Sequence, residues 1–116
     1  MSEKKDTEQN MDLRKKVPPS FLSKLATVWR LNEEQARALL KINELTDKND
    51  IKARLKLLVK IRVWLDGFFR DVEVEKQWLC EKHEMLDKAK PLELILSGEL
   101  KNLQRVEGVV AYMCGH

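Results

Sequence analysis

The chain has 116 residues, of which 43% are hydrophobic and 35% charged, and this balance excludes a disordered chain and indicates a single soluble domain. Its 4 glycines and 3 prolines supply too few turn residues for a sheet of many short strands, so an all-α fold is predicted, a small bundle of about five helices. A formal net charge of +3 is too small to indicate nucleic-acid binding by itself.

The N-terminal residues 1–16 are mixed-charge and polar, which predicts a disordered tail. They contain no apolar stretch like that of a signal peptide. The apolar pattern of residues 51–69 is interrupted by charged side chains, which excludes a membrane span there. Cys80 and Cys114 lack a paired motif and indicate a reducing compartment. We therefore expect a cytoplasmic protein that does not enter a membrane.

Two short helices are predicted in residues 17–46. Apolar side chains recur at helical spacing over 21–29, and Asn32 with Gln35 forms a capping-box pattern that begins the second helix. The pair resembles the first half of a helix-turn-helix. Residues 43–50 then lead directly to a long helix and are too few for a turn and a recognition helix. The module is therefore expected to be truncated, and sequence-specific DNA binding to be weak or absent.

A long helix is predicted from Ile51 to Phe69, with a length of roughly 28 Å. Asp47, Asn49 or Asp50 can cap its first turn. Its apolar arc is broad, which is typical of a central helix contacted from two sides. The predicted core residues of this helix are Trp64, Leu65 and Phe69. Its lysine-rich arc is interpreted as a solvated face, because no aromatic side chain is interleaved for stacking on bases.

The stretch from residue 71 to residue 98 predicts a helix, a connector and a second short helix. Asp71 is a good N-cap, with acidic residues following in the first turn. Helical spacing turns Val74 and Trp78 inward. Pro91 fits the first turn of the short helix and Gly98 fits just past its end. The core residues expected here are Trp78, Leu79, Pro91, Leu92 and Gly98.

The last predicted helix covers residues 99–113. Gly108 weakens it by roughly 1 kcal/mol relative to Ala, or lets another group approach closely. The exposed end combines Tyr and Met, which are common interface anchors, with Arg, which supplies directional hydrogen bonds. The predicted partner-binding residues are Arg105, Glu107, Tyr112, Met113, Gly115 and His116. In the alternative interpretation Tyr112 and Met113 only close the core.

A family resemblance adds to this interpretation. The spacing resembles that of the Xre/MbcA/ParS-type toxin-binding domain of bacterial antitoxins, and the likeness covers roughly residues 51–115. The residues that match in register are Trp78, Leu79, Leu86, Pro91, Leu92, Glu93, Leu94 and Gly98. Lys82-His83 stand where the family usually has Pro-Asn, and Asp87-Lys88 where it has Gly-Gly.

The resemblance implies a toxin-binding domain at 47–116 that includes the long helix. It also implies a role as the antitoxin of a type II toxin–antitoxin pair. The partner would be a RES-type toxin that consumes NAD or transfers ADP-ribose, and the antitoxin would block that toxin's active site sterically. Two alternatives stay open: a DNA-binding autoregulator, and a helical adaptor with an unrelated partner. Homodimer formation stays open as well.

No catalytic set, metal site or cofactor site is predicted. Cys80 and His83, with Cys114 and His116, could in principle form a tetrahedral zinc site, but the spacing matches no standard finger. The preferred interpretation makes Cys80 a half-buried small hydrophobe and places His83 at the connector surface. A Cys80–His83 nucleophile and base would lack a third group to orient them. We therefore expect a binding protein and not an enzyme.

Overall fold

The computed structural model describes residues 20–115, and in that range the chain is all-α, with no strand. The prediction of fold class is confirmed, with six α-helices in place of about five. The elements are α2 (Phe21–Val28), α3 (Glu33–Leu40), the 3-10 turn η1 (Lys41–Glu44), α4 (Lys48–Phe69), α5 (Val72–Leu79), the 3-10 turn η2 (Glu84–Leu86), α6 (Pro91–Leu96) and α7 (Leu100–Met113). The predicted tail, 1–16, lies outside the described residues.

Local sequence sets most helix ends. Asn32 and Gln35 form the predicted capping box at the start of α3. Asp71 accepts a hydrogen bond from the Glu73 amide and begins α5. Helix α4 begins at Lys48, three residues before the predicted start, because the carboxylate of Asp47 accepts from the Asn49 amide at 2.7 Å.

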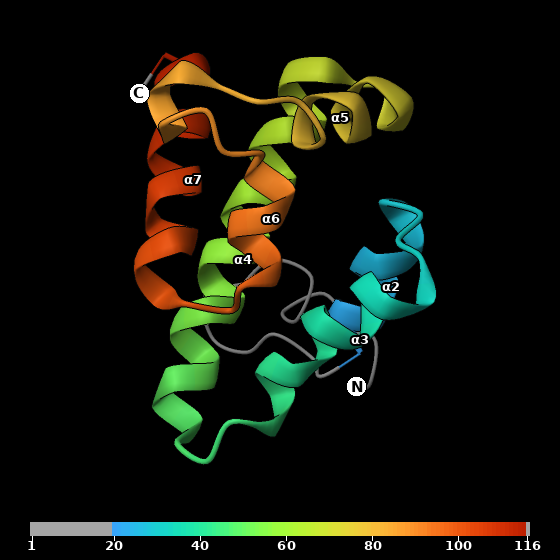
Figure 1. The fold of residues 1–116 in the computed structure, drawn as a ribbon, viewed down its shortest axis with the longest axis vertical. Helices are drawn as coiled ribbons and strands as arrows, with labels where there is room; N and C mark the ends of the chain where they lie inside the picture. The colour runs from blue at the N-terminus through green and yellow to red at the C-terminus, as the bar shows by residue number, and fades with distance from the viewer. Residues whose placement is uncertain (1–19, 116) are drawn as a thin grey trace, which may run out of the picture.

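Helix α4 is the central element, and α7 lies along it in the same direction (Figure 1). Near the start of α7, Arg54 Nε donates to the Gly98 carbonyl at 2.7 Å. Near its end, the Cys114 thiol lies 3.7 Å from the Trp64 carbonyl. Helix α5 contacts α4, helix α6 contacts α7 and α5, and α3 contacts α6. Among residues 20–115 no helix has both the length and the apolar character needed to cross a membrane.

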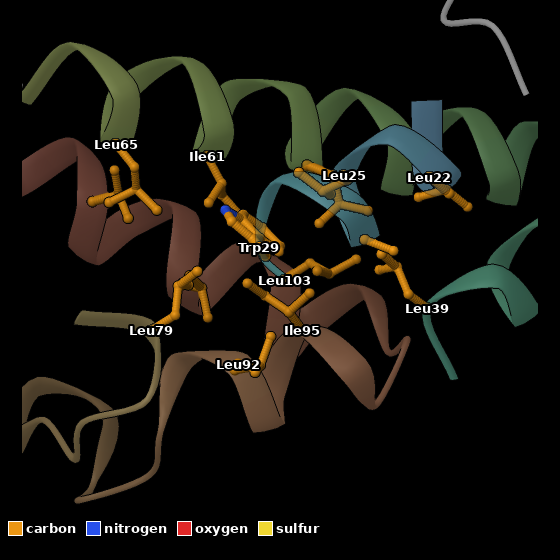
Figure 2. Packing of buried hydrophobic residues seen from close by; sticks show 14 of the residues in the cluster. Leu22, Leu25, Trp29, Leu39, Ile61, Leu65, Leu79, Leu92, Ile95 and Leu103 are labelled. Carbon is orange, nitrogen blue, oxygen red and sulfur yellow. The ribbon is translucent and has the colours of Figure 1, made fainter. Parts of the chain in front are cut away.

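One buried cluster joins all six helices, and Figure 2 shows its centre. The same cluster contains Leu22 of α2, Leu39 of α3, Leu65 of α4 and Leu103 of α7, together with Trp29, which directly follows α2. The predicted core residues that are buried are Leu65, Trp78, Leu79, Pro91 and Leu92. Trp64 and Phe69 are partly buried and pack against the cluster from outside, and Gly98, also predicted in the core, is partly buried.

The short helix α6 has the predicted ends. Pro91 stands at its first turn, and Lys90 makes no side-chain cap. Gly98 follows its C-cap with φ +73°, a conformation that favours glycine. An added Cβ at Gly98 would meet the Ile42 side chain at 3.9 Å. The glycine is therefore required by its backbone conformation, while space for a side chain is present.

Candidate functional site

The outer face of α7 is exposed along its length. Positions 101, 104, 105, 108 and 112 recur at steps of three and four residues, so they share one side of the helix, and all five are exposed. Tyr112 is 70% exposed, the most of the large hydrophobic side chains in the described part of the chain. An aromatic side chain this exposed contributes little to the core and is available to a partner.

The connector between α5 and α6 crosses to the C-terminal part of α7 (Figure 1). There Arg105 Nη2 donates to Asp87 Oδ2 at 2.8 Å. Met85, in η2, is 56% exposed. We call Met85, Asp87, Arg105, Gly108 and Tyr112 the α7–η2 surface. It combines two exposed apolar side chains with an exposed ion pair.

The structure separates the predicted partner-binding residues. Arg105 and Tyr112 share the outer face of α7, whereas Met113 is partly buried against the core. Glu107 is partly buried too, and Gly115 is exposed with φ +88°. His116 lies outside the described residues. Sequence reasoning missed Met85, because a lone Met in a polar connector carries no periodic signal.

The connector itself is a compact loop. The His83 amide donates to the Ala89 carbonyl at 3.2 Å, and the Lys88 amide donates to the His83 carbonyl at 2.8 Å. Asp87 and Lys88 have φ values of +56° and +67°. These conformations are costly for residues with a Cβ and easy for glycine.

The aromatic rings of Trp78 and His83 lie 4.6 Å apart between centroids and anchor this loop. The ring Nε2 of His83 also lies 3.0 Å from the Trp78 carbonyl. His83 is therefore partly buried, and it is Cys80 that lies exposed, contrary to the expected half-buried Cys80. The reason is that α5 ends at Leu79, and the chain turns away from the core at the next residue.

A second cluster, around Glu75, is buried. Glu75 is 0% exposed and is the one buried charged residue among residues 20–115. Its carboxylate accepts from Trp29 Nε1 at 2.6 Å and from Arg62 Nη1 at 3.2 Å. Lys76 reinforces the same junction by donating to the carbonyls of Trp29 and Arg30. These bonds attach α2 to α4 and α5.

The inward face of α5 therefore differs from the prediction. Val74 was expected inside but is exposed, while Glu75 occupies the buried position. Trp29 and Arg62 supply donors that satisfy the carboxylate, so burial of a charged group is tolerated there. Trp29 is 46 residues away in the chain, so no local pattern could have indicated this contact.

Burial raises the pKa of the Glu75 carboxyl above its ordinary value of 4.5. The hydrogen bond from Trp29 and the positive charge of Arg62 oppose this rise in pKa. The negative charge of Asp66 adds to it. A raised pKa means that the folded protein binds the proton more tightly than the unfolded chain does. The resulting stabilisation is complete below the unfolded pKa and is lost as pH rises through the folded pKa.

We therefore expect a pH-dependent stability difference between the wild type and Glu75→Gln. The wild type should lose unfolding free energy relative to the variant as pH rises above the ordinary carboxyl pKa of 4.5, because the variant has no proton to release. Urea denaturation of both proteins at several pH values measures the difference, and other titrating groups cancel in it. A difference independent of pH would show that Glu75 does not titrate in this range.

The remaining hollow and side-chain clusters of the described residues offer fewer polar or charged groups for binding. A hollow of about 240 Å³ between α3, η1 and α6 has one ionisable side chain, Lys41, in its lining. In residues 20–115 no three His, Cys, Asp or Glu side chains are grouped to hold a metal ion. Between α3 and α4 the chain forms only η1 and residues 45–47, so no helix of recognition-helix length stands there.

The α7–η2 surface is the strongest candidate binding site. It presents apolar, aromatic and charged groups together on adjacent elements, and it lies where the sequence predicted partner binding. The Glu75 cluster, by contrast, is closed to solvent and has a structural role. Comparison of the chain with models of known protein families, with curated proteins and with solved structures found no match.

Proposed function

We propose that this chain is the antitoxin of a type II toxin–antitoxin pair, which binds a RES-type toxin and blocks that toxin's active site sterically. The proposal begins from the resemblance to the Xre/MbcA/ParS-type toxin-binding domain. It assigns the chain no catalytic step. Inhibition would come from covering the site where NAD or an ADP-ribose acceptor enters.

The observation that carries the proposal is the backbone of the connector. Asp87 and Lys88 stand where that family usually has Gly-Gly, and both have positive φ. A glycine pair is what such a backbone favours. The positive φ values at these two positions therefore support the proposed register, although this chain has no glycine at either of them. Pro91 at the start of α6 and the positive φ of Gly98 support the same register.

The α7–η2 surface is the part of the chain that we assign to toxin binding. Tyr112 and Met85 offer apolar contact area, and Tyr, Met and Arg are enriched at protein interfaces. The Arg105–Asp87 pair is exposed and contributes at most about 1 kcal/mol to folding. Arg105 can therefore exchange Asp87 for a carboxylate of the partner at little cost.

The test is Tyr112→Glu, co-expressed with a RES-type toxin; the proposal expects the gene for that toxin to lie beside the gene for this chain. A carboxylate in place of the exposed aromatic ring should leave the fold intact and weaken toxin binding by about tenfold or more, as removal of an interface anchor does. Growth rescue and titration with a catalytically inactive toxin measure the effect. Deletion of residues 106–116 is unsuitable, because Val106, Val109 and Val110 belong to the core.

Val63→Glu is the matched control. Val63 is 52% exposed on α4, so the change introduces the same charge on another face. This variant should bind the toxin like the wild type. If Tyr112→Glu and Val63→Glu bound the toxin equally well, the toxin would not bind at the α7–η2 surface. A wild-type chain that neither binds nor rescues would refute the antitoxin function itself and favour a helical adaptor.

A further inference from the structure

Gly108 is unexplained by the fold of this chain. It lies in the middle of α7, where glycine lowers helix stability relative to other residues. Its φ is not positive, so no backbone conformation demands glycine. A Cβ built at this position would meet no atom within 4 Å, so close packing inside the chain does not demand it either.

Gly108 interrupts a row of longer, exposed side chains on α7. Gln104 and Tyr112 lie four residues before and after it, in one row along the outer face of α7, and all three positions are exposed. In helix packing such a row forms a ridge that enters the groove of a neighbouring helix. The missing side chain interrupts the ridge and leaves a gap between two longer side chains.

We infer that this gap receives an acidic helix of the toxin, an inference that rests on the proposed function. A helix fits better than an extended strand, because the backbone groups in the middle of α7 are already bonded within the helix. A strand would find no free main-chain partners there. A ridge of the partner helix enters at Gly108, and Tyr112 covers its side.

The charge of the face specifies the partner further. The outer positions of α7 include Lys101 and Arg105 and no carboxylate. Arg105 is held by the exposed Asp87, whereas no ion pair holds Lys101 within the described chain. Carboxylates on the partner helix would complement both cations. A second copy of this face would bring the same two cations, with only the Asp87 carboxylate that Arg105 already pairs with, and is the less suitable occupant.

The test compares Gly108→Leu with Gly67→Leu. Gly67 is an exposed glycine within α4, and an added Cβ there also meets nothing within 4 Å. Both variants should melt higher than the wild type, by about 5 °C, because leucine favours the helix. Gly108→Leu alone should weaken binding of the inactive toxin by about tenfold or more, because the side chain fills the gap.

The opposed changes in stability and binding exclude misfolding as the cause of lost affinity. Equal toxin binding by the two leucine variants overturns the inference, while the proposed function survives if the wild type binds. If the wild type does not bind the toxin, both fail. A wild-type chain that is dimeric alone, and that Gly108→Leu makes monomeric, would assign the gap to a second copy and overturn the inference as well.

Lys101→Glu tests the acidic character of the partner, with Lys56→Glu on the exposed face of α4 as its control. The first variant should weaken toxin binding, and the wild-type affinity should fall as salt is added. Equal binding by both charge variants would overturn the acidic partner.

Discussion

Replacement of Trp29 by Ala is expected to lower the unfolding free energy by about 3–5 kcal/mol, the range for removal of a large buried aromatic side chain. Trp29 is fully buried between α2, α4 and α5. The change also takes the indole donor from Glu75, which costs about 1–3 kcal/mol more for a buried acceptor. Urea denaturation followed by far-UV circular dichroism measures the loss.

Two further variants separate these contributions. Trp29→Phe keeps much of the volume but lacks the N–H donor, so it should lose less than Trp29→Ala. Tyr112→Ala removes an exposed aromatic side chain and should change stability by no more than about 0.5 kcal/mol. If Trp29→Ala unfolded at the same urea concentration as Tyr112→Ala, the buried junction of α2 with Glu75 would be wrong.

Trp78→Ala is the second substitution with a large expected effect. Trp78 is 8% exposed, and its removal should also cost about 3–5 kcal/mol. The ring lies against His83, so the connector should loosen along with the core. Hydrogen exchange at the Lys88 amide, which donates to the His83 carbonyl, reports on the loop.

Phe68→Ala serves as the comparison for Trp78→Ala. Phe68 is 51% exposed at the end of α4 and contacts Phe69 edge to face. Its removal should cost no more than about 1 kcal/mol. Two results together would show that Trp78 does not anchor the connector. One is a melting temperature of Trp78→Ala equal to that of Phe68→Ala. The other is exchange of the Lys88 amide at the wild-type rate.

Several elements followed from the sequence because their causes are local. The capping box of Asn32 and Gln35, the cap at Asp71, Pro91 at the first turn of α6 and Gly98 past its end depend on residues a few positions apart. Helical spacing likewise placed Trp78 inside. Each of these signals involves residues only a few positions apart, so it can be recognised in the sequence without knowledge of the tertiary structure.

The candidate site was predictable only in part. Arg105 and Tyr112 share a helix, so spacing alone puts them on one face. Met85 belongs to η2, which comes into contact with α7 through the crossing of the connector, and no local pattern encodes that crossing. Met113 follows Tyr112 in sequence but turns about 100° around the helix and meets the core instead.

The sequence by itself determined where helices form, several of their caps and the apolar side of most of them. The tertiary structure decided which side chains cover those sides. Val74 and Glu75 exchange their expected places because Trp29 and Arg62, from other helices, supply the donors that a buried carboxylate needs. Periodicity specifies the direction of a side chain around its own helix, but burial depends on the neighbour that it meets, and long-range packing alone sets that neighbour.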